Sequence, residues 1–201
     1  MKYRILEEYA DMLEKEGLLI SYDGGYARDA GMDVQIKDIS YNSILCGEGT
    51  LFICKGANFK SQYLSDAIEK GAVGFVCSSD FDEIDRFKNI PHLVVGDMRR
   101  AISKISAMYF DRSWDRGLKL VGLTGTKGKS TTATMIKSIL DVHCGREVGF
   151  SSGIYTYDGK QREKARKLTT PETIELHRIL DGCVRNDCKY LVMEVSSQAL
   201  K

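Results

Sequence analysis

The chain has 201 residues, 43% of them hydrophobic, and its 29 basic and 28 acidic side chains give a formal net charge of +1. This length is enough for one large or two small domains with hydrophobic cores, and the balanced charge does not support a nucleic-acid-binding surface. No apolar run reaches the ~18 residues of a membrane span, and the N-terminus leads into an amphipathic helix rather than a secretion signal, so we expect a cytoplasmic protein with no nucleic-acid and no membrane partner.

The first half of the chain alternates between helical and extended patterns. Apolar residues recur at helical spacing from Ile5 to Leu13, and Gly17 ends this predicted helix. Asp23-Gly-Gly25 predicts a turn. The remaining predictions here are strands over 34–40, 50–55, 73–77 and 92–95, helices over 63–70 and 98–109, and an acidic turn over 80–85.

The polar segment 111–117 holds the single tryptophan, and we expect it to connect two domains, 1–111 and 112–201. After it the sequence predicts buried strands over 118–123 and 190–195, a short strand over 148–151, a hairpin over 155–160, a basic stretch over 160–167, and helices over 132–140 and 171–185. Strands that alternate with helices indicate an α/β fold with mostly parallel sheets.

The most informative segment is Leu123-Thr-Gly-Thr-Lys-Gly-Lys-Ser-Thr131, between a predicted strand and a predicted helix. Glycines in such a turn let backbone N–H groups surround an anion, and the helix N-terminus adds partial positive charge. Lys129 would reach the β- and γ-phosphates, and the Ser130 hydroxyl would bind Mg²⁺. The pattern therefore predicts ATP or GTP binding, although Leu123 stands where the common motif has its first glycine; a plain surface turn is the alternative.

A second motif is Leu168-Thr-Thr-Pro-Glu172, before the last predicted helix. It is typical of a helix start, with Thr170 as N-cap and Pro171 at the first helical position. Two adjacent hydroxyls at a helix N-terminus would also suit a substrate carboxylate or phosphate. The spacing does not decide between these interpretations.

Glu194 lies at the end of the last predicted strand, in Glu194-Val-Ser-Ser-Gln-Ala-Leu200. Ligands of open α/β sheets bind at the carboxyl ends of the strands. A carboxylate there, beside a phosphate-binding loop, is placed to hold Mg²⁺ directly or through water. The alternative is a solvated strand end, with Ser196, Ser197 and Gln198 as ordinary loop residues.

A third motif joins Tyr41-Asn-Ser43 to the segment 49–60, which begins Gly-Thr-Leu-Phe. Lys55 and Lys60, together with the backbone at Gly56, could hold a second phosphorylated ligand. Both lysines could equally be surface charges.

The six cysteines form no Cys-x-x-Cys pair, and Cys54 and Cys77 lie in apolar runs typical of a core. In a cytoplasmic setting we expect no disulfide or zinc site. The histidines, His92, His143 and His177, are scattered, and we expect structural roles for them.

Together these motifs resemble the Mur ligase family, over nearly the whole chain from about residue 36 to residue 201. The resemblance rests on Asn-Ser before Gly-Thr-Leu-Phe, on Gly122-Leu-Thr-Gly-Thr-Lys-Gly-Lys-Ser-Thr, on Leu-Thr-Thr-Pro-Glu and on Met193-Glu-Val-Ser-Ser-Gln. It implies an N-terminal α/β UDP-binding domain followed by part of a P-loop parallel-sheet ATPase domain.

The resemblance also implies the reaction. ATP would phosphorylate the D-glutamate carboxylate of UDP-MurNAc-L-Ala-D-Glu, and a diamino acid would attack the acyl phosphate in a step of peptidoglycan synthesis. ATP and Mg²⁺ would be required, and we expect a monomer.

The resemblance assigns residues by their match to the family motifs. Lys129 and Glu194 would be catalytic, and Ser130 and Glu194 would hold the metal. The ATP-binding residues would be Gly125, Thr126, Lys127, Gly128, Lys129, Ser130 and Thr131. The substrate-binding residues would be Asn42, Ser43, Lys55, Asn58, Lys60, Thr169, Thr170, Ser196, Ser197 and Gln198.

Two departures from the family pattern affect these assignments. The usual Asp-Ser-Arg of the uridine site is Asn42-Ser43-Ile44, and the usual Glu-Val-Ser-Ser-His ends in Gln198. Gln198, with Thr-Lys-Gly-Lys in the loop and Lys-Gly-Ala-x-Phe-Lys over 55–60, resembles the subgroup that adds L-lysine. The more widespread subgroup adds meso-diaminopimelate.

Members of the family continue into a C-terminal domain with a further metal-binding His and a carbamylated Lys. We therefore expect this chain to be a fragment that is inactive as a ligase. Two alternatives stay open. One is a folylpolyglutamate synthase-like ligase, which shares the P-loop but lacks a UDP-binding domain, and the other is a non-catalytic P-loop module that binds nucleotide.

Overall fold

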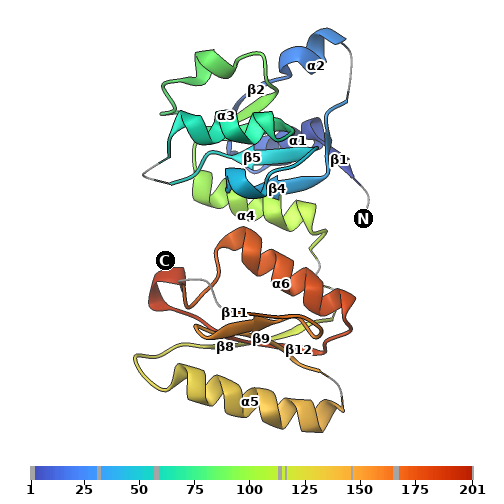
Figure 1. The fold of residues 1–201 in the computed structure, drawn as a ribbon, viewed down its shortest axis with the longest axis vertical. Helices are drawn as coiled ribbons and strands as arrows, with labels where there is room; N and C mark the ends of the chain where they lie inside the picture. Colours follow the sequence, from blue (N-terminus) through green and yellow to red (C-terminus); the bar gives the residue numbers. More distant parts are fainter. Residues whose placement is uncertain are drawn as a thin grey trace. The chain divides into compact units, whose positions relative to one another are not determined.

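The computed structural model describes residues 3–30, 33–56, 59–112, 115, 117–145, 147–164 and 168–200. Parts of the predicted connection 111–117 and of the basic stretch 160–167 lie outside these residues. The chain divides into two compact units, Met1–Tyr109 and Phe110–Lys201. Each unit is an α/β structure built on its own sheet (Figure 1).

The sheet of the first unit is mostly parallel, as predicted. Its described strands run in the order β2 (Leu19–Asp23), β7 (His92–Val95), β6 (Ala72–Ser78), β5 (Thr50–Ile53) and β4 (Asp38–Ser40). The last four are parallel neighbours, and β2 is antiparallel to β7. Outside this sheet, β1 (Arg4–Ile5) pairs with β3 (Gln35–Ile36).

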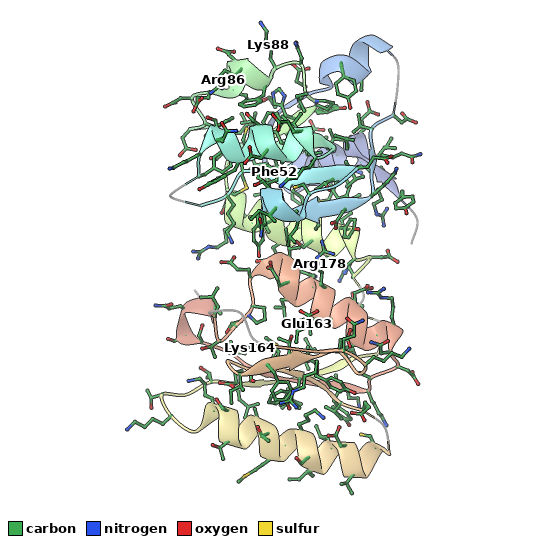
Figure 2. The ribbon with its side chains drawn as sticks, in the orientation of Figure 1. Phe52, Arg86, Lys88, Glu163, Lys164 and Arg178 are labelled. Carbon is green, nitrogen blue, oxygen red and sulfur yellow. The ribbon has the colours of Figure 1, made fainter. Side chains whose placement is uncertain are left out.

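Helices cover both faces of this sheet, with α3 on one face and α1 and α4 on the other (Figure 1). The helices are α1 (Leu6–Lys15), α2 (Gly25–Ala30), α3 (Ser61–Glu69) and α4 (Met98–Tyr109), with short 3-10 turns η1 (Ser43–Leu45) and η2 (Ile84–Phe87). Phe52 of β5 packs with Leu64 and Ala67 of α3, and Figure 2 shows its side chain inside the unit. Cys54 and Cys77 belong to the same buried cluster, which confirms their assignment to the core.

Two parts of the first unit differ from the sequence prediction. The strand predicted over 34–40 is interrupted at Lys37, whose N–H donates to the Gly49 carbonyl (2.8 Å), so that β3 and β4 pair with different partners. The predicted turn at Asp23 exists as an Asx-type bond from the Gly25 N–H to Asp23 Oδ1 (2.9 Å). It joins β2 to α2, neither of which the sequence predicted.

The sheet of the second unit has the described order β11 (Arg162–Lys164), β10 (Tyr155–Tyr157), β9 (Gly149–Ser151), β12 (Tyr190–Glu194) and β8 (Lys119–Leu123). Strands β9, β12 and β8 are parallel, and β10 with β11 forms the predicted hairpin. Helix α6 (Thr173–Arg185) covers one face and α5 (Lys129–Cys144) the other (Figure 1), and η4 (Ser197–Leu200) follows β12.

Successive side chains of β12 pack on opposite faces of the sheet and contribute to two hydrophobic clusters of the second unit. Leu191 packs with Leu180 and Cys183 on the α6 side. Val192 packs with Ala133 and Phe150 on the α5 side. The period of two residues in a strand therefore places Glu194 on the same face as Val192, toward α5.

The sequence predicted a buried strand over residues 118–123. A strand is present there, but it is not buried. Strand β8 forms at this place, but Leu120 is 50% exposed and Lys119 and Gly122 are also exposed. The physical reason is that β8 is an edge strand, paired only with β12 among the described residues. The apolar run of β12 is buried as predicted, because β12 has a neighbour on each side.

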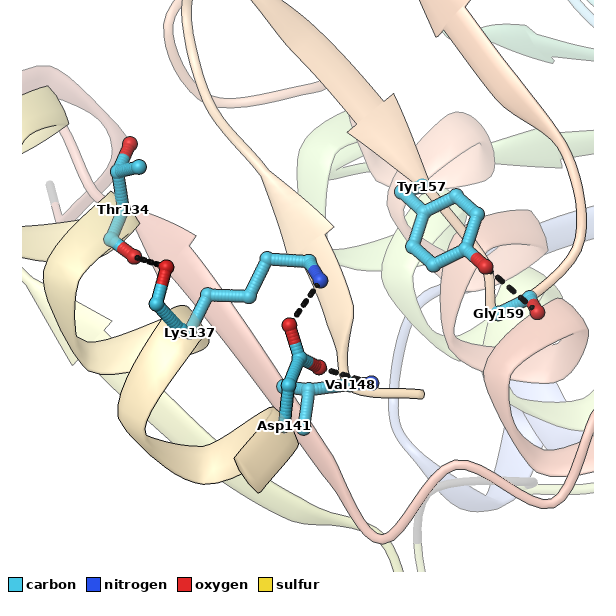
Figure 3. A network of polar contacts seen from close by, with 7 residues as sticks. Thr134, Lys137, Asp141, Val148, Tyr157 and Gly159 are labelled. Atoms are coloured by element: carbon cyan, nitrogen blue, oxygen red, sulfur yellow. Dashed lines mark hydrogen bonds and ion pairs between the residues drawn. The ribbon is translucent and has the colours of Figure 1, made fainter. Parts of the chain in front are cut away.

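A polar network fixes the connection between α5 and β9 (Figure 3). Asp141 accepts from Lys137 Nζ (2.6 Å) and from the Val148 N–H (2.9 Å). The carboxylate thus satisfies a backbone donor just before β9 while it pairs with a lysine one helical turn earlier.

A helix that crosses a membrane must be both long and apolar. None of the helices of the described residues meets both requirements.

Burial of the His177 side chain makes the free energy of unfolding of the chain depend on pH. This α6 residue is 8% exposed and stacks on Phe110 with ring centroids 6.0 Å apart. Desolvation lowers its pKa from 6.5 to about 4. The unfolded chain therefore binds a proton at this residue that the folded chain does not, throughout the window between the two pKa values.

We predict that His177 removes roughly 2 kcal/mol from the free energy of unfolding as the pH falls from 6.5 to about 4. Urea unfolding of the wild type, of His177→Gln and of the exposed-site control His143→Gln should be measured at both ends of this window. His177→Gln should lose less stability than the other two. Equal losses in all three proteins would contradict the assignment.

Candidate functional site

The loop between β8 and α5 has the backbone shape of an anion cradle. Gly125 and Gly128 adopt φ angles of +150° and +78°, which other residues rarely reach, and Gly128 is the N-cap of α5. Residues 124–128 are exposed, and Lys129 Nζ donates to the Gly125 carbonyl (2.7 Å). A lysine folded over a loop of this shape, at a helix N-terminus, suits a polyphosphate.

A buried carboxylate lies beside this loop. Strand β12 runs parallel to β8 with Glu194 opposite Leu123, and the Val195 N–H donates to the Leu123 carbonyl (2.8 Å). Glu194 is 2% exposed, and its Oε1 accepts from the Gly153 N–H (3.3 Å). Because β8, β9 and β12 are parallel, the residues that follow them meet at one edge of the sheet.

Thr170 ties a further segment to the same edge. Its hydroxyl accepts from the Ser196 N–H (2.8 Å) and donates to the Glu194 carbonyl (3.3 Å). The predicted N-cap role of Thr170 is wrong, as is the first helical position of Pro171, since α6 begins at Thr173 with Glu172 as its N-cap. The hydroxyl bonds across to the end of β12 instead of capping the helix.

The structure therefore gathers many of the predicted site residues of the second unit. A Cβ added at Gly153 would lie 3.8 Å from the Thr169 hydroxyl, so Thr169 belongs to the group. Ser197 and Gln198 follow on η4 and are exposed. The sequence analysis missed the Gly153 amide, although its position directly after the β9 region was a usable signal.

The first unit collects its own predicted residues at the carboxyl ends of β4 and β5. Lys55 Nζ lies 5.0 Å from the centre of the Tyr41 ring, which links the two strand ends. Ser43 is buried, and its carbonyl accepts from Lys70 Nζ (3.0 Å). Asn42 Oδ1 accepts from the Ile44 N–H (3.0 Å), which closes the turn that presents Ser43.

The structure does not bring the other predicted site residues of the first unit together with this group. Lys60 is exposed and is the N-cap residue of α3. Asn58 lies outside the described residues. Ile44, where the family has Arg, is 76% exposed. The sequence analysis named Tyr41 only as part of a motif and did not select Lys70, whose contact with Ser43 joins residues 27 positions apart.

The donor set at the second unit's edge suits Mg²⁺ better than a metal held entirely by protein. Among the described residues no group of three or more His, Cys, Asp or Glu side chains could hold a metal ion. Mg²⁺ typically takes one or two protein ligands and completes its shell with phosphate oxygens and water. The Ser130 hydroxyl and the Glu194 carboxylate could supply those ligands.

Comparison with known proteins identifies the same region. Residues 123–201 match the family described as the Mur ligase middle domain. The chain is 37% identical over 195 residues to a UDP-N-acetylmuramoyl-L-alanyl-D-glutamate–L-lysine ligase of Streptococcus pneumoniae, covering 96% of this chain and 39% of the relative. It is 36% identical over 199 residues to a UDP-N-acetylmuramyl-tripeptide synthetase of Lactococcus lactis, covering 98% and 39%. The chain thus spans about two fifths of these relatives' length.

Solved structures agree on the fold. A UDP-N-acetylmuramoyl-L-alanyl-D-glutamate–2,6-diaminopimelate ligase superposes with a TM-score of 0.72 at 16% identity, over 99% of this chain and 37% of that one. MurF from Acinetobacter baumannii gives a TM-score of 0.59 at 20% identity, over 98% and 36%. At these identities the likeness supports the α/β fold.

The bridge made by Thr170 gives a stability prediction. Thr170→Val keeps the shape of the side chain but leaves the Ser196 N–H without its acceptor, so unfolding should become easier by about 1–2 kcal/mol. Thr169→Val, which leaves the bridge intact, should cost less. Urea unfolding of both variants tests this, and equal effects would show that the bridge does not stabilise the edge.

Proposed function

The chain belongs to the Mur ligase family, and we propose that it serves an ATP-dependent ligase that joins a diamino acid to UDP-MurNAc-L-Ala-D-Glu in peptidoglycan synthesis. The observation that carries this proposal is the glycine-rich loop placed beside the buried Glu194 carboxylate. A simple surface turn would not need a carboxylate that is 2% exposed at its side.

We propose that the loop holds ATP. Lys129 would neutralise the β- and γ-phosphates, and the backbone at Gly125 and Gly128 would supply N–H donors. The lining residues would be Thr126, Lys127, Ser130 and Thr131. When bound by Ser130 and Glu194, Mg²⁺ would supply charge that offsets the negative charge of the transferring phosphoryl group.

The substrate carboxylate would lie at the same edge. The D-glutamate carboxylate would accept the γ-phosphoryl group, and the amine of the diamino acid would then displace phosphate to form the amide. Thr169, Ser196, Ser197 and Gln198 would contact the UDP-sugar-peptide. The role of Thr170 would be to hold the end of β12 in place, since its hydroxyl bonds to Glu194 and Ser196.

The UDP part would bind the first unit. The turn at Asn42 and Ser43, with Lys55, presents polar groups and a cation at the carboxyl ends of β4 and β5, and Lys60 follows as the N-cap residue of α3. This is the edge where an open α/β sheet binds ligands. We therefore propose domains 1–111 for UDP-substrate binding and 112–201 for ATP binding.

We propose L-lysine as the diamino acid. The supporting observations are the 37%-identical relative, which is named as an L-lysine ligase, and Gln198, which stands where the family usually has histidine. We also propose a cytoplasmic location, where ATP and UDP-linked precursors occur, and a monomer.

Thermal unfolding of the chain with separate ligands tests the proposal. A ligand that binds only the folded state raises the midpoint. UDP, and more strongly UDP-MurNAc-L-Ala-D-Glu, should raise the midpoint of the wild type, as should Mg-ATP. Lys129→Met should weaken Mg-ATP binding by roughly tenfold or more, since it removes a charged phosphate contact, and should leave the UDP response intact.

Matched variants separate the two ligands. Lys55→Met should reduce the UDP response and spare the Mg-ATP response, whereas the exposed Lys88→Met should change neither. Figure 2 shows the control lysine on the outside of the first unit. A response to Mg-ATP with none to UDP would favour the folylpolyglutamate synthase-like alternative or a non-catalytic nucleotide-binding module.

A further inference from the structure

Two cysteines meet at the end of α6. The Cys188 N–H donates to the Cys183 carbonyl (2.8 Å), and the Asp187 N–H donates to the Val184 carbonyl (3.1 Å), with Asp187 at φ +59°. These bonds form a Schellman motif, which characteristically brings the first and last of its six residues into side-chain contact. In this chain both of those residues are cysteine, and the Cys188 thiol also donates to the Asp158 carbonyl (3.5 Å).

The surrounding structure leaves room for the two sulfur atoms. A Cβ at Gly149 would lie 2.4 Å from Cys183 Sγ, and one at Gly159 would lie 2.5 Å from Cys188 Sγ. The Gly159 carbonyl is held by the Tyr157 hydroxyl (2.9 Å; Figure 3). Two glycines from separate segments therefore make space for the thiol pair.

The two thiols differ in access. Cys183 is fully buried, whereas Cys188 is 8% exposed and lines a cavity of about 300 Å³ with Cys144 and Lys189. A small solute in the cavity would meet Cys188, whereas the fully buried Cys183 is not among the residues that line the cavity. This difference in access suits Cys188 as the thiol that reacts first and Cys183 as the resolving thiol that then forms the disulfide.

We propose that Cys183 and Cys188 form a peroxide-reactive dithiol that closes to an intrachain disulfide. The Cys188 thiolate attacks one peroxide oxygen, the O–O bond breaks, and a Cys188 sulfenic acid and hydroxide result. The Cys183 sulfur then attacks the Cys188 sulfur and an S–S bond forms. The S–O bond breaks, and the departing hydroxide takes the Cys183 proton to become water. The hydroxide from the first step takes up the proton that Cys188 released on ionising. The two sulfurs lose two electrons and the peroxide gains them, so the net products are one disulfide and two waters.

The electrostatics agree with these roles. The neighbouring Cys183 thiol, opposed by burial and by the Asp158 charge, lowers the pKa of the Cys188 thiol and so favours its thiolate. The neighbouring Cys188 thiol, together with burial, raises the pKa of Cys183, which stays a thiol. Cys54 and Cys77 also lie close together in the first unit, but burial raises both of their pKa values, so they offer a matched unreactive pair.

Oxidation of the native chain with hydrogen peroxide, followed by alkylation of the remaining thiols and peptide mapping, tests the proposal. The expected product is a Cys183–Cys188 disulfide with Cys54 and Cys77 still reduced. Cys183→Ala should stop at the sulfenic acid on Cys188, which dimedone traps. Cys188→Ala should slow oxidation of Cys183 by at least about tenfold, because its thiol is buried and protonated.

The control variant is Cys144→Ala, which should leave disulfide formation unchanged. Circular dichroism of each variant establishes that it folds, and the wild-type peptide map needs no variant. A Cys144–Cys188 disulfide, oxidation of Cys54 and Cys77 at the same rate, or overoxidation of Cys188 with Cys183 still reduced would each overturn the proposal.

Discussion

The parallel pairing of β12 with β8 on one side and β9 on the other is the constraint on which the second unit depends. Parallel strands end at the same edge, so segments from three parts of the chain meet there. The glycine loop follows β8, Gly153 lies just beyond β9, and Glu194 ends β12. A shift of one residue in the pairing of β12 would turn Glu194 away from the α5 face and place Met193 there.

The same rule organises the first unit, where β4, β5, β6 and β7 are parallel neighbours. The ends of β4 and β5 present the turn at Ser43 and the Lys55 side chain together. Under the proposed function each unit would bind its ligand at one such edge, and the chemistry would differ because the loops differ. A glycine-rich loop at a helix N-terminus suits a polyphosphate, whereas the first unit presents a short turn at Ser43 and the Lys55 cation over the Tyr41 ring.

Much of the fold could be predicted from the sequence, because local patterns determined it. The helical spacing over 98–109 and the apolar run over 92–95 gave the bounds of α4 and β7 as the structure has them. The strand–loop–helix order around Lys129 was equally local. The α/β class and the largely parallel pairing followed from the alternation of such segments, and the structure and the related proteins confirm both.

The parts that sequence patterns could not give depend on contacts between distant residues. An edge strand and a central strand have the same apolar composition, so the exposure of Leu120 was not readable from its neighbours. Thr170 matches a helix cap by its spacing, and only the end of β12, 24 residues later, shows where its hydroxyl bonds. The Cys183–Cys188 pair has no recognised cysteine spacing; the turn after α6 creates the contact.

The central claim is that the glycine loop and Glu194 form one metal–nucleotide site. The chain is 22.5 kDa, so amide NMR spectra of the chain with ATP can be recorded with and without a small amount of Mn²⁺ in place of Mg²⁺. Our account predicts that paramagnetic broadening is strongest at the amides of Gly128, Ser130, Gly153 and Val195. Broadening that spares Gly153 and Val195, or that centres on the acidic turn over 80–85, would contradict it.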